Sequence, residues 1–215
     1  MTGKLDRRKA RTRQLLYDAL MTLLQEKNAD AITVTDVADR ADVNRGTFYL
    51  HYRDVGDMLQ QLKDDVFTRM RGCVEKLDIT EAIRYIDKEE PYPVSIAIFE
   101  EVARHGEFLR IMLGQQGDLS FARQLRELFA TRVQAKLGTF SPEDRAVPLD
   151  YLVSYIASAN FGIVTHWLDT GRQLAPRQMA KMMVNLMSYG PLVSGGIRKK
   201  PELVESKRNV KMQPD

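Results

Sequence analysis

The stretch that decides the fold is ITVTDVADRADVNRGTFYLHYRDVGDML, residues 32–59. Thr33 and Asp36 have the spacing of a capping box, in which a hydroxyl and a carboxylate three residues later each bind a backbone N–H at the start of a helix. Asn44 is a good N-cap for another helix, which must begin only a few residues after the first one ends. The pattern therefore predicts two short helices joined by a very tight turn, a helix-turn-helix.

The second helix of this pair is predicted to have one buried face and one shallow exposed face. Placed on a helix at about 100° per residue, residues 45–52 put Phe48 and Tyr52 on the face that packs into the core. The opposite face has little bulk at its start, because Gly46 and Thr47 are small. The residues predicted on the exposed face and its flanks are Arg45, Gly46, Thr47, Tyr49, Leu50 and His51.

Such a shallow face suits the major groove of double-stranded DNA, which is about 12 Å wide and admits a helix whose leading surface is not blocked. Arg45 and Thr47 lie at the helix start, where side chains reach base edges, and Gly46 allows close backbone approach. Tyr49 and His51 have polar tips placed for the sugar-phosphate walls, which fix register without reading sequence. An ordinary amphipathic surface is the alternative for Tyr49 and His51.

Charge is distributed unevenly along the 215 residues, although the formal net charge is only +3. Residues 1–53 contain 10 Lys and Arg against 7 Asp and Glu, whereas residues 54–197 contain 16 against 19. The cationic side chains near the start are Lys4, Arg7, Arg8, Lys9, Arg11 and Arg13, offset locally only by Asp6. This pattern is typical of a chain that approaches phosphates, and a solvated helix face is the alternative.

The rest of the sequence predicts further helices and no strands, so the expected fold class is all-α. Apolar residues recur at helical spacing, and Gly and Pro separate the periodic segments. Besides the two short helices, the expected helices are 6–26, 54–77, 94–105, 107–114, 119–137, 148–169 and 176–189. Gly106 is predicted to end the 94–105 helix as a left-handed cap. Residues 194–215 combine Gly, Pro and mixed charge and are predicted to form a flexible basic tail.

Several classes of function find no support in the sequence. The single Cys73 excludes an internal disulfide and a multi-cysteine metal site, and His51, His105 and His166 are far apart in the chain. The sequence contains no Walker A loop, dinucleotide glycine motif or His-Glu-x-x-His pair. We therefore predict no catalytic residues, no metal and no cofactor, and expect a protein that is not an enzyme.

Residues 151–168 contain no Asp, Glu, Lys or Arg and must be tested as a membrane span. The length of this segment is at the lower limit for a spanning helix. Ser, Asn, Thr and His side chains are scattered through it, and Asp150 and Asp169 bracket it. A helix buried in protein is the preferred interpretation. Because no signal peptide is visible, the expected location is cytoplasmic.

Residues 32–59 resemble the helix-turn-helix of the tetracycline-repressor (TetR) family of bacterial transcription regulators, and residues 106–128 resemble one C-terminal subgroup of that family. The resemblance implies a three-helix DNA-binding domain at 1–53, a larger helical domain at 54–193 that dimerises and holds an effector, and the tail at 194–215. Carried over to this chain, it places DNA-contacting residues at Thr33, Thr35, Asn44, Arg45, Gly46, Thr47, Tyr49, Leu50, His51 and Arg53.

The chain departs from the family pattern at two positions. Asp42 stands where the family commonly has Gly, at a turn position that favours positive φ, and Asp tolerates that conformation better than most residues. Val55 stands where the family often has Lys, near the start of the fourth helix. Arg53 is the predicted substitute for the phosphate contact that this Lys would make.

The resemblance also implies a dimer interface and an effector site in the larger domain. In the family, the last two main helices of each subunit form a four-helix interface, for which the candidates here are Tyr155, Met179, Met182, Met183, Leu186 and Met187. The candidate effector-binding residues are Phe99, Val102, Phe108, Met112, Phe121, Leu125, Asn160, Phe161 and Trp167. Ordinary core packing is the alternative for both sets.

The resulting hypothesis is a sequence-specific DNA-binding transcriptional regulator with repression as the family's usual mode. It would bind a palindromic operator as a homodimer and be released by an unidentified small-molecule effector. Two-fold symmetry would set the two recognition helices about 34–36 Å apart. The alternative is a helical ligand carrier or interaction protein of the same fold that does not act through DNA. Neither hypothesis includes a membrane partner.

Overall fold

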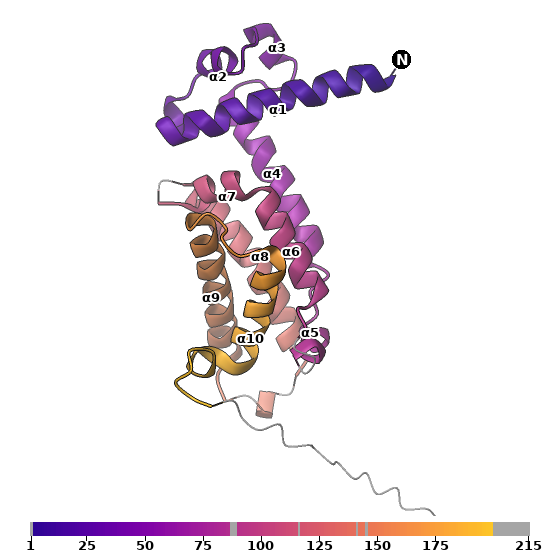
Figure 1. The fold of residues 1–215 in the computed structure, drawn as a ribbon, viewed down its shortest axis with the longest axis vertical. Coiled ribbons are helices and arrows are strands. Elements are labelled where there is room, and N and C mark those ends of the chain that lie inside the picture. The colour runs from indigo at the N-terminus through magenta and orange to yellow at the C-terminus, as the bar shows by residue number, and fades with distance from the viewer. Residues whose placement is uncertain (1, 87–89, 116, 141, 145, 200–215) are drawn as a thin grey trace, which may run out of the picture.

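The computed structural model describes residues 2–86, 90–115, 117–140, 142–144 and 146–199 of the 215-residue chain. Every regular element in this part of the chain is helical: ten α-helices and two short 3-10 turns. The prediction of an all-α fold is therefore confirmed. The elements form a small N-terminal unit and a longer helical bundle below it (Figure 1). Most of the predicted flexible tail, residues 200–215, lies outside the described residues.

The N-terminal unit contains α1 (Thr2–Glu26), a 3-10 turn (Ala29–Ala31), α2 (Val34–Arg40) and α3 (Arg45–Tyr49). The helix α1 lies across the end of the molecule, with α2 and α3 on the side away from the bundle (Figure 1). It begins earlier than the predicted start at residue 6, and α3 ends before the predicted end at residue 52. The predicted three-helix arrangement is nevertheless present.

Side-chain caps fix the starts of α2 and α3. The Thr33 hydroxyl accepts a hydrogen bond from Asp36 N (3.2 Å), while Asp36 Oδ2 accepts one from Thr33 N (2.8 Å), which is the predicted capping box. Asn44 Oδ1 accepts a hydrogen bond from Thr47 N at 2.7 Å. Between the two helices, Asp42 has a φ of 53°, the left-handed conformation expected at this turn. The caps satisfy backbone N–H groups that the short helices would otherwise leave unpaired.

Phe48 and Tyr52 attach α3 to the core of this unit, as predicted. Both are buried, and their ring centroids lie 5.7 Å apart. They belong to a hydrophobic cluster that also contains Leu16 and Leu20 of α1 and Val37 of α2. A helix as short as α3 is not stable alone, so this burial holds it in place.

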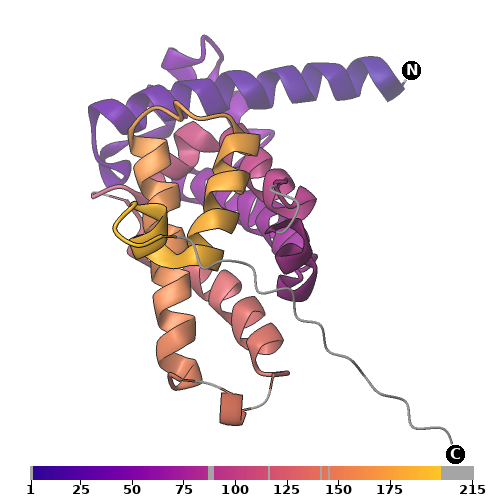
Figure 2. The ribbon, with the colours of Figure 1, turned by 60° about the horizontal axis from the view of Figure 1, so that its bottom comes forward.

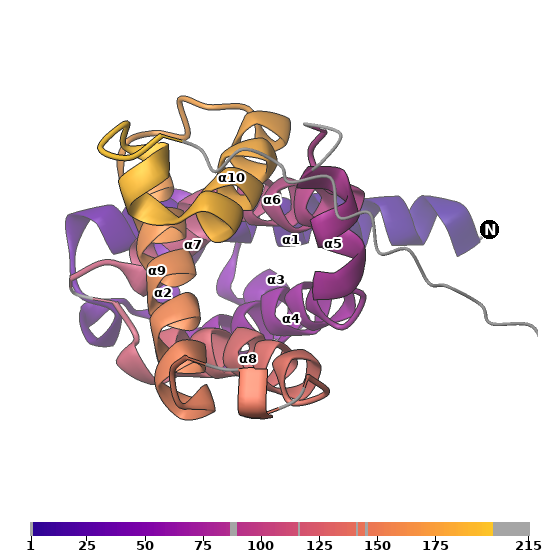
Figure 3. The ribbon, with the colours of Figure 1, turned by 90° about the horizontal axis from the view of Figure 1, so that it is seen from below.

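The larger unit is a bundle in which one long helix, α4 (Val55–Val74), continues from the N-terminal unit (Figure 1). α8 packs against α9 and α4, and α6 packs against α4 and α10. Seen from below, α4, α5, α6, α8, α9 and α10 surround the centre of the bundle (Figure 3). The other elements of the bundle are α5 (Ile79–Ile86), α6 (Pro93–Arg104), α7 (Gly106–Leu113), α8 (Leu119–Leu137), a 3-10 turn (Pro142–Asp144), α9 (Leu149–Asp169) and α10 (Pro176–Ser194).

The short helix α5 lies in a segment for which no helix is predicted from sequence. Asp78 caps its start, because Asp78 Oδ1 accepts hydrogen bonds from Thr80 N (3.0 Å) and Glu81 N (3.2 Å). The helix has only 8 residues. Two turns give too few repeats for helical periodicity to stand out in a sequence.

The prediction that Gly106 forms a left-handed cap is wrong. α6 ends at Arg104, His105 has a φ of −101°, and α7 begins directly at Gly106. Gly106 is instead buried beneath Arg172, whose Nη1 donates a hydrogen bond to Ala103 O at 2.6 Å. A Cβ at position 106 would overlap with that guanidinium. Glycine leaves room here for the side chain of Arg172, a residue that is distant in sequence.

The uncharged segment 151–168 forms most of α9, and it packs against α8 and α7. Trp167 is buried near the end of this helix, and its Nε1 donates a hydrogen bond to Leu174 O at 3.0 Å. α9 and α10 lie on the same face of the bundle (Figure 2). In the part of the chain that the structure describes, no helix has the length and apolar character needed to cross a membrane.

The two units share one hydrophobic core. A single cluster of buried residues extends from Leu16 of α1 through Met58 and Val66 of α4 to Leu168 of α9. A polar contact adds to it, since Gln25 Nε2 of α1 donates a hydrogen bond to an oxygen of the Glu107 carboxylate on α7 at 2.6 Å. The position of α1 therefore depends on the bundle beneath it.

Replacing Phe48 by Ala should lower the free energy of unfolding of the N-terminal unit by about 3–5 kcal/mol, because it removes a fully buried ring and leaves a cavity. Leu50 is the matched control, since it adjoins the same short helix and is 81% exposed. Leu50→Ala should change that free energy by less than about 0.5 kcal/mol. Native-state hydrogen exchange of amides in α1–α3 measures both. Equal effects of the two substitutions would show that Phe48 does not anchor α3.

Candidate nucleic-acid interface and effector cavity

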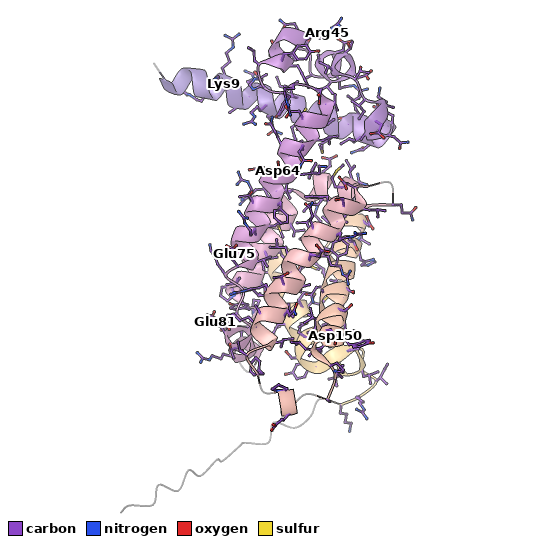
Figure 4. All side chains as sticks on the ribbon, turned by 180° about the vertical axis from the view of Figure 1, so that it is seen from behind. Lys9, Arg45, Asp64, Glu75, Glu81 and Asp150 are labelled. Carbon is purple, nitrogen blue, oxygen red and sulfur yellow. The ribbon has the colours of Figure 1, made fainter. Side chains whose placement is uncertain are left out.

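The predicted exposed face of α3 is present. Arg45, Gly46, Tyr49 and Leu50 are all exposed, and Thr47 is half-buried. Arg45 lies at the end of the molecule farthest from the bundle (Figure 4). The side of α3 that carries the small residues therefore faces outward, while Phe48 fills the inward side.

Asn44 organises the start of this face. Its Oδ1 accepts hydrogen bonds from both Thr47 N (2.7 Å) and Thr47 Oγ1 (2.9 Å). The hydroxyl proton of Thr47 is thus used within the protein, whereas the hydroxyl oxygen retains its capacity to accept a hydrogen bond from a ligand. Asn44 acts on this surface mainly by holding Thr47 and the helix start.

Basic side chains of α1 lie beside α3. The Arg13 guanidinium lies over the ring of Tyr52, with Cζ 5.7 Å from the ring centroid, and its Nη2 donates a hydrogen bond to Gln61 Oε1 at 3.2 Å. Partial burial lowers the pKa of His51 below its ordinary value of 6.5, and the charges of Arg13 and Lys9 lower it further. His51 is therefore mainly neutral at pH 7.

Charge is separated along the molecule. Lys9 and Arg45 belong to the N-terminal unit, whereas Asp64, Glu75 and the other labelled acidic residues lie along the bundle (Figure 4). The whole-segment counts agree, with 10 Lys and Arg against 7 Asp and Glu in residues 1–53 and 16 against 19 in residues 54–197, so a polyanion should approach the end that carries α3 more favourably than the bundle.

The remaining predicted contact residues surround α3. Thr33 is exposed, but its Oγ1 donates a hydrogen bond to Asp36 Oδ2 at 2.8 Å. Thr35 is half-buried in the first turn of α2. Arg53 is exposed, and its Nη2 donates a hydrogen bond to Asp57 Oδ1 at 3.1 Å. These residues belong to the helix-turn-helix or follow it directly, and their contacts with DNA stay a prediction.

A cavity of about 630 Å³ lies inside the bundle. Side chains from every helix between α4 and α10 line it, and most of them are apolar. Of the residues predicted for the effector site, five line this cavity: Phe99, Val102, Leu125, Asn160 and Phe161. The structure therefore brings together just over half of the predicted set.

The other four predicted effector residues are packed in the core and do not line the cavity. Phe108 and Phe121 make an edge-to-face contact with ring centroids 6.0 Å apart, and Met112 is buried in the same cluster. Trp167 packs its edge against Phe99 at 5.5 Å. We therefore assign these four residues to core packing and not to the effector site. Helical periodicity identifies a buried side chain, but it does not show whether that side chain packs against a neighbour or lines a cavity.

The side chains predicted for the dimer interface differ in how much of their surface is exposed. Met179 and Met183 are buried within this chain, so for them core packing is the correct interpretation. Met182 and Leu186 are half-buried, whereas Tyr155 and Met187 are exposed. The apolar stripe of α10 thus faces the bundle more than it faces solvent.

Several residues of the cavity wall escape prediction from sequence, and the charged one among them is Arg126 of α8. It occupies the same stripe of α8 as Phe129, Val133 and Leu137, at positions i, i+3, i+7 and i+11. A single cation in an otherwise apolar stripe was the available signal.

In the described residues, no three His, Cys, Asp or Glu side chains are grouped to bind a metal ion.

Two family models match the chain. One, described as bacterial regulatory proteins of the tetR family, matches residues 16–62, and the other, for the C-terminal region of TetR-type transcriptional regulators, matches residues 89–189. The chain belongs to the TetR family. TetR-family members are DNA-binding transcriptional regulators and not enzymes, so these two predictions are confirmed.

Relatives of this TetR-family chain agree with that assignment. An uncharacterized HTH-type transcriptional regulator of Bacillus subtilis (strain 168), YxbF, is 21% identical over an alignment of 197 residues that covers 86% of this chain. The chain spans about half the length of that relative, 49%.

Solved structures show the same fold. A TetR transcriptional regulator from Streptococcus agalactiae 2603V has 23% identity and a TM-score of 0.54, covering 86% of this chain and 98% of its own. FadR, a fatty acid degradation regulator from Bacillus halodurans, has 16% identity and a TM-score of 0.53, and the match covers 88% of this chain and 97% of the FadR chain.

The helix-turn-helix should lose stability in acid through Asp36. Hydrogen bonds from Lys27 and Thr33 hold the pKa of Asp36 well below its ordinary value. The stabilisation is therefore complete above the unfolded-state pKa of about 4 and is lost as the pH falls below it toward the folded-state value. Asp36→Asn should lower the melting temperature at pH 7 and reduce its dependence on pH below about 4. Circular dichroism melts across that range measure both effects.

Asp39→Asn is the matched control for this titration. Asp39 is exposed and belongs to the same helix, outside the capping box. This variant should keep the acid dependence of the unchanged protein. If Asp36→Asn keeps that dependence as well, the capping box does not contribute to acid sensitivity.

Proposed function

We propose that this TetR-family regulator represses transcription by binding a palindromic operator as a homodimer, and that a small molecule in the bundle cavity releases it from DNA. The observation that carries the proposal is the shallow exposed face of α3, supported from behind by Phe48 and Tyr52. The proposal includes a cytoplasmic location for the protein.

Arg45 and Thr47 are the residues whose side chains we expect to read bases. Arg45 is the first residue of α3, and arginine is the side chain that most often recognises guanine in the major groove. Gly46 is exposed beside it and allows the helix backbone to approach the groove. Lys9 and Arg13 of α1 flank this surface and would contact phosphates, which position the protein without specifying sequence.

A dimer formed through α9 and α10 would account for apolar side chains that are exposed on these helices. Tyr151 and Tyr155 of α9 are 70% and 58% exposed and lie one helical turn apart. Met187 of α10 is also exposed, at the wall of the bundle cavity. Large exposed apolar side chains such as the two tyrosines are typical of protein interaction sites. A two-fold axis at this face would supply the second recognition helix that a palindrome requires.

α4 connects the cavity to the DNA-binding unit. Met70 and Val74 line the cavity, while Val55 and Met58 of the same helix pack in the cluster that contains Phe48. A ligand that displaces Met70 and Val74 would therefore move a helix whose other end supports α3. A coupling free energy of about 1–3 kcal/mol would change operator affinity tenfold or more.

Selection of bound sequences from random duplex DNA should recover an imperfect palindrome. Arg45→Ala should then relax the preference at one symmetric base position by about 1–3 kcal/mol, because it removes a contact to a base edge. Arg84→Ala is the control, since Arg84 is an exposed arginine on α5, in the bundle. It should leave the recovered sequence and the affinity unchanged.

Salt dependence distinguishes a regulator from a carrier of the same fold. A dimer that contacts several phosphates should lose orders of magnitude in operator affinity between low and physiological salt concentrations. Equal binding to every duplex, or binding to none, would overturn the operator proposal and favour the carrier.

Tyr155→Glu should convert the dimer to a monomer and weaken operator binding, because it places a charge within the proposed apolar interface. Leu119→Glu is the matched control, since Leu119 is an exposed apolar residue at the start of α8. This control should remain dimeric in sedimentation velocity experiments. An unsubstituted protein that is monomeric both alone and on a full palindrome would contradict the proposed interface.

A further inference from the structure

The wall of the bundle cavity is mostly apolar and contains one cation. Aliphatic and aromatic side chains such as Phe99, Leu125 and Phe161 form most of its wall. Among the described residues that line it, Arg126 is the one charged residue. The uncharged polar residues of the wall are Ser95, Asn160, Ser188 and Tyr189.

Arg126 lacks a counter-charge. Its Nη2 donates hydrogen bonds to Ser158 Oγ (3.2 Å) and Ser154 Oγ (3.5 Å) on α9. Its Nε is buried and has no hydrogen-bond partner. Within the described part of the chain, none of the ion pairs involves Arg126. The guanidinium therefore retains unused capacity to bind an anion.

The charge of Arg126 discriminates between classes of ligand. A neutral apolar ligand that filled the cavity would leave the buried Nε without a hydrogen-bond partner, which is unfavourable. A cationic ligand would add repulsion between like charges. A carboxylate supplies opposite charge and two acceptor oxygens, which match the planar donors of arginine.

The shape of the wall determines what the rest of the ligand must be. Phe129, Val133 and Leu137 continue along α8 from Arg126 on the same stripe. At 1.5 Å per residue, this apolar stripe extends about 16 Å beyond the cation. The cavity volume of about 630 Å³ is in the range typical of small-molecule sites. An extended apolar body would therefore fit next to the charged group.

We propose that the cavity binds an anionic amphiphile, a small molecule with an extended apolar body and a carboxylate, and that Arg126 binds the carboxylate. This inference rests on the proposed effector role of the cavity and names the chemical class of the effector.

Titration calorimetry with dodecanoate and dodecanol tests the proposal, because the two ligands share an alkyl chain and differ in head-group charge. The unsubstituted protein should bind dodecanoate at least about tenfold more tightly than dodecanol. Arg126→Gln should remove this difference by weakening the binding of dodecanoate alone. Arg123→Gln is the matched control, since Arg123 is exposed on the same helix, and it should leave both affinities unchanged.

The comparison of the two ligands on the unsubstituted protein is decisive even if Arg126→Gln does not fold. Equal affinity for acid and alcohol, or binding of neither, would overturn the proposal. If a folded Arg126→Gln variant, verified by circular dichroism, loses affinity for both ligands equally, Arg126 shapes the cavity and does not bind the carboxylate.

Operator binding, measured on the same preparations, separates this inference from the proposed function. Protein that binds operator DNA but shows no preference for dodecanoate overturns the role of Arg126 and leaves the DNA-binding function intact. Protein that prefers dodecanoate through Arg126, but whose operator affinity does not change with it, supports the assigned ligand class and overturns release by that ligand.

Discussion

Burial of two aromatic rings behind α3 is the constraint on which the exposed face of this helix depends. With 5 residues, α3 cannot maintain a helix through its own backbone hydrogen bonds. Phe48 and Tyr52 hold it against α1 and α2, and Asn44 caps its start. The rotation that buries these rings also turns Arg45 and Gly46 outward. The exposed face is thus a consequence of the core behind it.

The helix α4 belongs to both units, and it connects the exposed face of α3 with a distant cavity. Its first turns pack beneath the helix-turn-helix, and its last turns line the cavity. Lys63, near the middle of α4, forms an ion pair with Asp118 at the start of α8 (2.9 Å). The middle of α4 is therefore held by the bundle while its two ends meet different sites.

Local features of the sequence were sufficient to predict the helix-turn-helix. The spacing of Thr33 and Asp36 and the pairing of Phe48 with Tyr52 depend on residues only a few positions apart. α3 ends earlier than predicted, but Tyr52, which follows the turn at residues 50–51, still packs against Phe48.

The cavity depends on contacts between distant segments, which the sequence does not reveal. Phe99 lines it and Phe108 does not, although both lie on apolar-periodic helices. Likewise, the charge of Arg126 is visible in the α8 pattern, but its serine partners come from α9. The role of Gly106 was also hidden in the sequence, because the side chain that packs over it belongs to Arg172, which is 66 positions further along the chain.

The contact of Arg172 with Ala103 has a consequence for assembly. Arg172 lies in the turn between α9 and α10 and has a φ of 55°, a conformation that few residues other than glycine adopt. Its hydrogen bond attaches that turn to the corner between α6 and α7, and Glu107 at the same corner holds the end of α1. Pairing of two subunits through α9 and α10 would therefore directly fix the position of α1 in each protomer. Two protomers could then align their N-terminal units even when the cavity is empty.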